Sequence, residues 1–177
     1  MRLFIGIRAG CIKYLGSLQQ MLKKAGNGNF TLAENLHITL KFLGDVPSSR
    51  LRDLRAAITE TGGSAFSLEC QGMHMMGKGG IVSARVGGDL EVLSALVSRL
   101  EDALEKRGFE REARPYHPHI TLVRNFHALQ GDDVASMAHK GCRFKVQEII
   151  LFESRREAGK LVYAPLFAHP LPPQPEN

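Results

Sequence analysis

Two stretches of the chain, His37-Ile38-Thr39-Leu40 and His119-Ile120-Thr121-Leu122, carry the same four residues in the same order. Each stretch alternates polar and apolar side chains, which is typical of a strand with one buried face. On such a strand the histidine and the threonine point to one side, and the isoleucine and the leucine point to the other side, toward a core. The repeated string therefore predicts two equivalent strands, each presenting a His-Thr pair.

The elements around the two strings follow the same order in both halves of the sequence. Hydrophobic periodicity predicts strands at 3–8, 36–43 and 65–70, then at 81–86, 119–123 and 143–152, with 161–167 pairing to the last. A helix is expected between the strands each time, ended by Gly26, Gly62, Gly108 and Gly141 in turn, with the last one opening at Asp132. The order strand–helix–strand–helix–strand occurs twice, so we infer an internal duplication.

The two predicted repeats cover about 1–76 and 80–168 within a single two-lobed domain of residues 1–177. Residues 169–177 are rich in proline and are expected to form a loose tail. With a pseudo-two-fold axis between the lobes, the two His-Thr faces meet across a cleft. This arrangement brings two imidazoles and two hydroxyl groups around one small space.

Composition places the chain among ordinary globular proteins. Of its 177 residues 44% are hydrophobic and 23% are charged, and the formal net charge of +5 permits a phosphate-bearing partner without demanding one. No stretch is long and apolar enough for a membrane span, and the apolar run after Arg2 is too short for a signal peptide. Cys11, Cys70 and Cys142 lie far apart, so we expect buried thiols in a reducing cytoplasm.

The repeated His-Thr pair carries a defined chemistry. A histidine with its ordinary pKa, about 6.5, gains or loses a proton near neutral pH, so one imidazole can accept a proton while the other donates one. Hydroxyl groups between them supply hydrogen bonds to oxygens that gain charge. His37, Thr39, His119 and Thr121 therefore form the equipment for in-line displacement at phosphorus without a metal.

Four neighbours are weaker candidates for substrate binding. Lys41 continues the alternation of the first string and can face the same cleft, and Arg124 ends the second string, where it can clamp phosphate. Phe4 on the first strand offers an aromatic ring for stacking a base, although core packing is the more common role of such a residue. Tyr116 precedes the second string and is placed at the same edge.

His117 and His119 raise a competing interpretation, because an HxH pair on one strand face is a known style of metal ligation. A metal site needs a third or fourth ligand, and no Asp, Glu or Cys lies close in the sequence. We therefore expect no metal and no cofactor.

The two strings and their flanks, residues 34–44 and 117–124, resemble the 2H phosphoesterase superfamily, and within it the RNA 2′,3′-cyclic phosphodiesterases, also called 2′-5′ RNA ligases. The first strand is similar to that family's first strand, and the segments around Ser154 and Tyr163 are similar to its closing hairpin. The resemblance covers nearly the whole chain. Val123 departs from it, since the family pattern has alanine there.

The resemblance implies an α+β fold in which two pseudo-symmetric lobes, each an antiparallel sheet with helices outside, face a central cleft. It implies metal-independent hydrolysis of RNA 2′,3′-cyclic phosphate ends to 2′-phosphates, with His37 as proton donor and His119 as proton acceptor. Thr39 and Thr121 would hold the phosphate oxygens. Run backwards with a 5′-hydroxyl in place of water, the same chemistry gives a 2′-5′ linkage.

The expected protein is a cytoplasmic monomer that acts on RNA or oligonucleotide ends, without a membrane. The alternative is a non-catalytic basic RNA-binding module in which the His-Thr faces only grip phosphate. Binding alone needs cationic side chains and gains nothing from a matched neutral and protonated imidazole pair. Turnover of a 2′,3′-cyclic phosphate distinguishes the two hypotheses.

Overall fold

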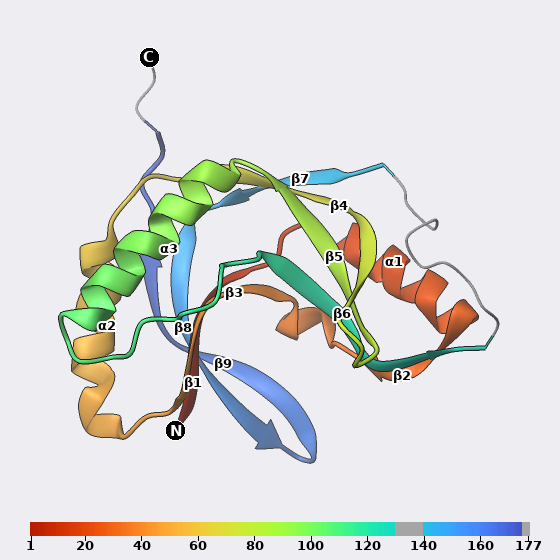
Figure 1. Cartoon of the computed structure of the whole chain (residues 1–177), viewed down its shortest axis with the longest axis horizontal. Coiled ribbons are helices and arrows are strands. Elements are labelled where there is room, and N and C mark those ends of the chain that lie inside the picture. The colour runs from red at the N-terminus through yellow and green to blue at the C-terminus, as the bar shows by residue number, and fades with distance from the viewer. Residues whose placement is uncertain (130–139, 175–177) are drawn as a thin grey trace.

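The computed structural model describes residues 1–129 and 140–174 of the chain (Figure 1). One antiparallel sheet has the strand order β3-β1-β8-β9, formed by β1 (Arg2–Arg8), β3 (His37–Asp45), β8 (Glu148–Glu157) and β9 (Lys160–Pro170). The other has the order β2-β6-β5-β4-β7, formed by β2 (Gly26–Phe30), β4 (Phe66–Met76), β5 (Ile81–Gly88), β6 (His119–Ala128) and β7 (Cys142–Val146). The expected α+β class with two antiparallel sheets is confirmed.

The helices lie outside the two sheets. Helix α1 (Ile12–Ala25) stands at one end of the molecule, and α2 (Leu51–Thr61) and α3 (Leu90–Glu105) pack together at the other end (Figure 1). Short 3-10 turns η1 (Ala33–Asn35) and η2 (Ser48–Arg50) precede β3 and α2. None of the helices in the described residues is long and apolar enough to cross a bilayer.

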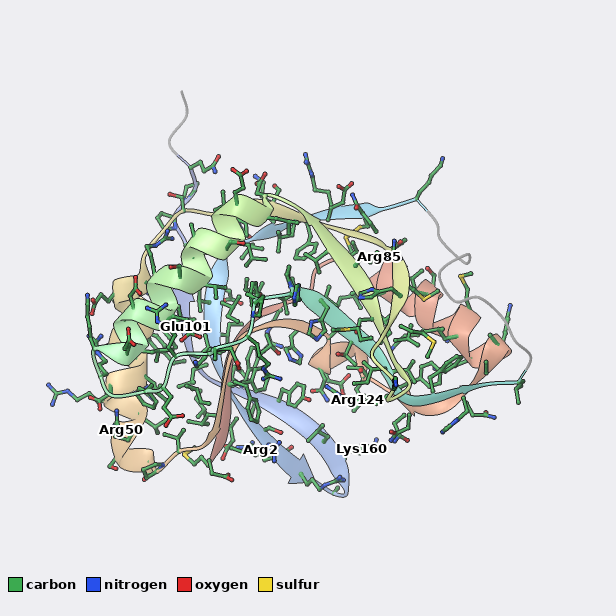
Figure 2. The ribbon with its side chains drawn as sticks, in the orientation of Figure 1. Arg2, Arg50, Arg85, Glu101, Arg124 and Lys160 are labelled. Carbon is green, nitrogen blue, oxygen red and sulfur yellow. A yellow bond between two sulfur atoms is a disulfide. The ribbon has the colours of Figure 1, made fainter. Side chains whose placement is uncertain are left out.

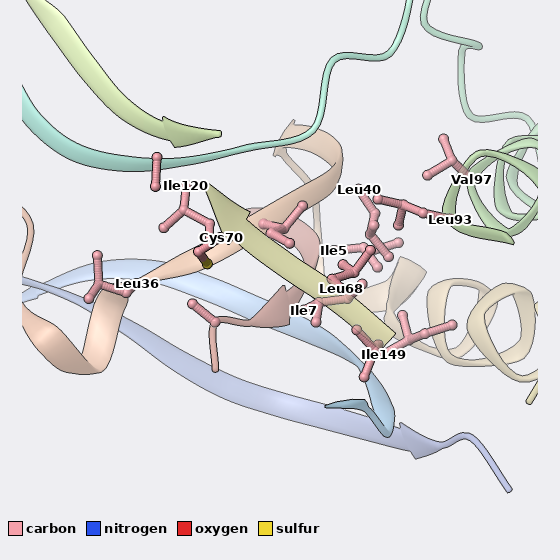
Figure 3. Packing of buried hydrophobic residues seen from close by; sticks show 14 of the residues in the cluster. Ile5, Ile7, Leu36, Leu40, Leu68, Cys70, Leu93, Val97, Ile120 and Ile149 are labelled. Carbon is pink, nitrogen blue, oxygen red and sulfur yellow. The ribbon is translucent and has the colours of Figure 1, made fainter. Parts of the chain in front are cut away.

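A hydrophobic core joins the two sheets and the helices into one body. Apolar side chains of β1 and β3, such as Ile5 and Leu40, pack toward Leu68 of β4 and Leu93 of α3 (Figure 3). The apolar residues of both repeated strings belong to this core, as their alternation predicts: Ile38, Leu40, Ile120 and Leu122 are all buried. The strands that carry the histidines are therefore anchored through their opposite face.

The sheets do not coincide with the two predicted repeats. β2 and β4 come from the first half but lie in the β6 sheet, and β8 and β9 come from the second half but lie in the β1 sheet. The predicted strand over 143–152 is wrong, because the chain leaves one sheet at Val146 and enters the other at Glu148. The internal duplication itself stays a prediction, and the helix expected after Asp132 lies outside the described residues.

Strand β2 was not predicted, because its residues Gly26-Asn27-Gly28-Asn29 lack the side chains that favour strands. Close packing requires the two glycines. A Cβ on Gly28 would lie 2.6 Å from the Val123 side chain, so the glycine provides the room for a valine at the position where alanine was expected. Tertiary contact, and not local propensity, forms this strand.

The tail after His169 is not loose at its start, contrary to the sequence-based expectation. Pro170 ends β9, Leu171 is buried, and its N–H donates to the carbonyl of Gln147 at 2.7 Å. The carbonyl of Pro172 accepts a hydrogen bond from the N–H of Ala65. These bonds fasten the chain beside β4 and β8, where the sequence suggested only a proline-rich end.

The expectation of three reduced thiols is wrong for two of the cysteines. Cys11 and Cys142 form a disulfide that joins the start of α1 to the start of β7. The two cysteines are brought together by close packing of their neighbours in the chain. Gly10, which precedes Cys11, lies so close to Phe144 that a Cβ on Gly10 would overlap the phenylalanine side chain. Cys70 is free, and burial in the core raises its pKa to about 11.

A one-residue bulge interrupts the alternation of each motif strand at the same place. In β3, Gly6 of β1 pairs with Thr39 and Ile5 pairs with Lys41, so Leu40 is the extra residue. In β6, Ser83 of β5 pairs with Thr121 and Val82 pairs with Val123, so Leu122 is the extra residue. After each bulge the two faces of the strand exchange. Two consecutive residues therefore enter the core, and the next one returns to the face of the His-Thr pair.

The bulge corrects the prediction for Lys41, which does not face the His-Thr side. The Lys41 side chain is only 8% exposed, and its Nζ lies 2.9 Å from Glu101 on α3 and 2.7 Å from the carbonyl of Glu110. A buried ion pair of this kind is costly to break, because removing one partner leaves an uncompensated charge in the core. Lys41 therefore ties β3 to α3.

We predict that Glu101→Leu lowers the free energy of unfolding by about 3–5 kcal/mol, because it leaves the Lys41 ammonium buried without its carboxylate. Adding Lys41→Met should recover most of this loss. Urea denaturation measures both, and Glu105→Leu, on an exposed face of α3, is the matched control with an expected effect below about 1 kcal/mol. Equal destabilisation by Glu101→Leu and Glu105→Leu would contradict this role.

Candidate functional site

A cleft of about 530 Å³ lies between β3 of one sheet and β6 of the other. The two His-Thr pairs meet in it, as predicted: His37 and Thr39 line it from β3, and His119 and Thr121 line it from β6. The other lining residues are Arg2, Phe4, Phe42, Arg124, Ser154, Arg155, Arg156, Leu161 and Tyr163.

Both histidines are held in the same way. The Nδ1 atom of His37 lies 2.6 Å from the carbonyl oxygen of Asn35, and Nδ1 of His119 lies 2.8 Å from the carbonyl oxygen of His117. A carbonyl only accepts hydrogen bonds, so each Nδ1 carries a proton and donates it. In the neutral form of either ring, Nε2 is then the basic nitrogen that is free to exchange a proton. His37 Nε2 lies 3.0 Å from the hydroxyl of Thr39, on the cleft side.

His37 is surrounded by aromatic rings. Its ring centroid lies 4.7 Å from that of Phe4, 5.0 Å from that of Tyr163 and 6.4 Å from that of Phe152. Burial among these groups lowers the pKa of His37; the bond to the Asn35 carbonyl opposes this effect, and the charges of His119 and Arg124 add to it. Gly6 makes the close packing possible, since a Cβ there would lie 2.8 Å from the Ile38 carbonyl.

Asn35 connects this site to the β8–β9 hairpin. Its buried side-chain amide donates to the carbonyl of Leu161 at 2.8 Å and accepts from the N–H of Tyr163 at 3.1 Å. Its own carbonyl is the partner of His37. One residue therefore fixes both the ring of His37 and the strand that carries Tyr163.

Arg124 lines the cleft, as expected, because the β6 bulge turns it to the same face as His119 and Thr121. Leu122, the extra residue of the bulge, has a carbonyl that accepts hydrogen bonds from Gln19 Nε2 and from the N–H of Thr31, both at 2.9 Å. Gln19 is a buried residue of α1. The helix thereby stabilises the bulge that places Arg124.

Phe42 is the counterpart of Arg124 in the β3 string, and it was not predicted to be a site residue. The β3 bulge turns Phe42 into the cleft, where its ring is 53% exposed and the Arg2 guanidinium lies 5.2 Å from the ring centroid. The repeat held the signal for this residue, since Phe42 occupies the same offset after His37 that Arg124 occupies after His119.

Phe4 and Tyr116 do not have the predicted surroundings. Phe4 borders the cleft but is 4% exposed, and its ring stacks on Phe152 at 5.0 Å, so no open face remains for a base. Tyr116 is not among the cleft-lining residues. Its hydroxyl donates to the carbonyl of Thr39 at 3.1 Å, next to the β3 bulge, and burial raises its pKa. Phe4 packs against the ring of His37, and Tyr116 holds the backbone of Thr39, so both residues support the site without facing the substrate.

Further arginines, which were not predicted as site residues, line the cleft. Arg2 lies on β1, and Arg124 lies on β6 of the other sheet (Figure 2). Arg155 and Arg156 of β8 also line the cleft. Arg155 is paired with Glu153 and Glu157. The pairing of β1 with β8 places Arg2 in the same sheet as Arg155 and Arg156, and no local pattern indicates this proximity.

The HxH hypothesis for His117 and His119 finds no further ligands. Across residues 1–129 and 140–174, no three side chains of His, Cys, Asp or Glu gather closely enough to hold a metal ion. The hydrogen bond between the two residues joins Nδ1 of His119 to the carbonyl oxygen of His117 at 2.8 Å.

Comparisons with known protein families and with individual proteins agree on one family. Residues 15–158 match the profile of the 2'-5' RNA ligase superfamily. The chain is 30% identical to an RNA 2',3'-cyclic phosphodiesterase of Geobacillus stearothermophilus, over 70% of this chain and 42% of that protein. It is 31% identical to one of Methanothermobacter thermautotrophicus, over 69% of this chain and 68% of that protein. The chain thus spans less than half the length of the Geobacillus relative.

Solved structures agree in fold. The structure of Escherichia coli LigT complexed with 3′-AMP superposes with a TM-score of 0.81 at 24% identity, over 96% of this chain and 97% of that one. A structure from Thermus thermophilus superposes with a TM-score of 0.76 at 22% identity, over 98% of this chain and 100% of that one. With the matched profile covering most of the chain and both motif strands, this protein belongs to the 2'-5' RNA ligase superfamily.

Proposed function

We propose that the cleft hydrolyses RNA 2′,3′-cyclic phosphate ends to 2′-phosphates by acid–base catalysis with two histidines. The observation that carries the proposal is the matched pair of imidazoles, each with Nδ1 fixed on a carbonyl, lining one cleft. The curated relatives bear the name RNA 2',3'-cyclic phosphodiesterase, which supports this substrate class.

In the proposed reaction, β6 supplies the general base and β3 supplies the general acid. Water attacks phosphorus opposite the P–O3′ bond, and His119 Nε2 accepts its proton. His37 Nε2 donates a proton to O3′ as the P–O3′ bond breaks, which leaves a 2′-phosphate and a 3′-hydroxyl. Thr39, Thr121 and Arg124 supply hydrogen bonds and charge to the phosphate oxygens as they become more negative.

The rest of the RNA has contacts available beside the reacting phosphate. The exposed ring of Phe42 offers a stacking face for a base, in the role first expected of Phe4. Arg2 and Arg156 border the same cleft and can neutralise neighbouring phosphates. The substrate we propose is therefore an RNA or oligonucleotide end.

The buried position of His37 sets a condition on its role as donor. Burial disfavours the imidazolium ion, so the pKa of His37 in the free enzyme lies below the ordinary value of 6.5. A bound phosphate brings a negative charge next to the ring and favours the protonated form. Substrate binding would thus charge the acid that the reaction needs.

A basic RNA-binding module remains the alternative function. Phosphate binding requires arginines and hydroxyl groups, which the cleft has, but it does not require two imidazoles with the same fixed tautomer. That shared detail favours catalysis.

The monomeric state and the cytoplasmic location remain predictions. A reducing compartment such as the cytoplasm does not favour a disulfide like the one between Cys11 and Cys142.

We predict that His37→Ala and His119→Ala each reduce the hydrolysis of a nucleoside 2′,3′-cyclic phosphate by about 10²–10⁴-fold, because each removes one proton transfer. Phosphorus NMR resolves the cyclic phosphate from the 2′-phosphate product. The matched control is His127→Ala, an exposed histidine of β6 outside the cleft, which should keep full activity. Wild-type protein that binds the nucleotide without turning it over would support the binding module instead.

The same assay with a chelator tests the absence of a metal. Neither EDTA nor added zinc should change the rate, because the proposed proton transfers use only protein side chains. Activity that disappears in EDTA and returns with zinc would revive the HxH site at His117 and His119.

NMR titration of His37 tests its electrostatic environment. In the free protein we expect its midpoint below pH 6.5, because burial penalises the charged ring. Saturating inorganic phosphate should shift the midpoint to higher pH, since the anion stabilises the imidazolium. The alkaline limb of kcat should accordingly lie at higher pH than the alkaline limb of kcat/KM, which reports the free enzyme. A His37 midpoint at or above pH 6.5 without phosphate would overturn this account of the acid.

A further inference from the structure

The three cysteines of the chain gather at the β7 edge of the five-stranded sheet. Cys142 of β7 is bonded to Cys11, with their Cα atoms 6.0 Å apart. Cys70 of β4, a free thiol, pairs directly opposite Cys142 in the β4–β7 ladder. Directly opposite residues of an antiparallel ladder project their side chains to the same face of the sheet. We call Cys11, Cys70 and Cys142 the cysteine cluster.

The backbone allows Cys142 to bond with either of the other two cysteines. Opposite residues of an antiparallel ladder have Cα atoms about 4.5–5.5 Å apart, and disulfides bridge Cα atoms about 4.4–6.8 Å apart. The two strands are close at this point, since a Cβ on Gly141 would lie 2.9 Å from the carbonyl oxygen of Cys70. The ladder therefore already places Cys70 within disulfide range of Cys142.

The sulfur atoms of the cluster differ in reactivity. Cys11 and Cys142 are partly exposed, so small reagents can reach them. Cys70 is fully buried, and burial, together with the charge of Glu69, raises its pKa to about 11. Because the thiolate is the attacking form of a cysteine, Cys70 attacks the neighbouring bond only slowly at neutral pH. The Cys11–Cys142 bond can therefore persist beside a free thiol.

The disulfide fastens the start of α1. Cys11 has a left-handed backbone conformation, with a φ of 56°, which is unfavourable for a residue other than glycine. Within the described part of the chain, its side chain makes no capping hydrogen bond, and the first turn of α1 contains no acidic residue. Opening the disulfide removes the covalent support of this conformation, so we expect the first turn of α1 to loosen.

Helix α1 connects the cysteine cluster to the catalytic cleft. In its first turn, the hydroxyl of Tyr14 accepts a hydrogen bond from the N–H of Gly72 on β4 at 2.9 Å. About two turns after Cys11, Gln19 Nε2 donates to the carbonyl of Leu122 at 2.9 Å. Leu122 is the bulge residue that turns Arg124 into the cleft. The position of α1 therefore affects the placement of a cation that borders the phosphate site.

We propose that the cysteine cluster is a thiol–disulfide exchange site in which Cys142 changes its partner from Cys11 to Cys70. The exchange releases the start of α1 and thereby weakens phosphate binding at Arg124. The Cys70 thiol loses its proton, and the thiolate attacks the sulfur of Cys142. The Cys70–Cys142 bond forms as the Cys11–Cys142 bond breaks, and Cys11 leaves as a thiolate that takes up a proton. The number of disulfides is unchanged, so the exchange needs no oxidant or reductant.

Trapping of the released Cys11 tests the exchange. The protein with its Cys11–Cys142 bond is incubated with iodoacetamide and no added thiol in mildly alkaline buffer, and its linkages are mapped by peptide mass spectrometry. The expected product carries an alkylated Cys11 and a Cys70–Cys142 bond. In Cys70→Ala, which lacks the attacking thiol, alkylation of Cys11 should be at least about tenfold slower.

Three results would overturn the exchange. They are an unsubstituted protein whose Cys11 is not alkylated, alkylation of Cys11 at equal rates in the unsubstituted protein and Cys70→Ala, and a product that links Cys11 to Cys70. The linkage map of the unsubstituted protein tests the exchange independently of any variant.

Binding of inorganic phosphate, followed by NMR titration, tests the coupling between the cluster and the cleft. This coupling rests on the proposed function of the cleft, whereas the exchange does not. Cys11→Ser removes the bond to α1 and should weaken phosphate binding by about fivefold or more. Cys70→Ala is the matched control, because it keeps the Cys11–Cys142 bond and should bind phosphate as tightly as the unsubstituted protein.

A second substitution shows whether the effect passes through Arg124. In an Arg124→Ala background, Cys11→Ser should cause no further loss of phosphate affinity, because the two substitutions act on the same contact. An equal loss with and without Arg124, or no loss in Cys11→Ser, would overturn the coupling. An unsubstituted protein that does not bind phosphate would instead overturn the proposed function of the cleft, and the linkage map would still decide the exchange.

Discussion

The paired bulges in β3 and β6 decide which side chains meet in the cleft. Without them, strict alternation would place Lys41 and Val123 beside the two His-Thr pairs and would turn Phe42 and Arg124 away. The carbonyls at the bulges are held by side chains from elsewhere, with Tyr116 bound to Thr39 and Gln19 bound to Leu122. One local irregularity, used twice, therefore sets both the core contact of Lys41 and the composition of the site.

The two halves of the site are similar in backbone but different in environment. The ring of His37 lies among Phe4, Phe152 and Tyr163, whereas His119 lines both the cleft and a second cavity beside it. Burial of His37 and the accessibility of His119 give these two identical side chains different electrostatic surroundings. This asymmetry supports different roles for them, since a donor next to the leaving group gains from a dry site and an acceptor must meet an incoming nucleophile.

The sequence was sufficient to predict five residues of the cleft and most elements, because a repeated string on alternating strands is a local signal. His37, Thr39, His119, Thr121 and Arg124 all line the cleft as predicted. What could not be predicted depends on contacts between distant segments. The bulge that buries Lys41, the glycine-rich strand β2, the crossing of the chain at Gln147 and the Cys11–Cys142 bond all follow from pairing that leaves no periodic trace.

The central claim, that His37 protonates the leaving oxygen while His119 deprotonates the nucleophile, is tested most directly by changing the leaving atom. A 2′,3′-cyclic phosphate with sulfur in place of O3′ expels a thiolate, which needs no proton. This substrate should restore most of the activity of His37→Ala and little of the activity of His119→Ala. Equal restoration of the two variants, or restoration of His119→Ala alone, would contradict the division of labour between the two strands.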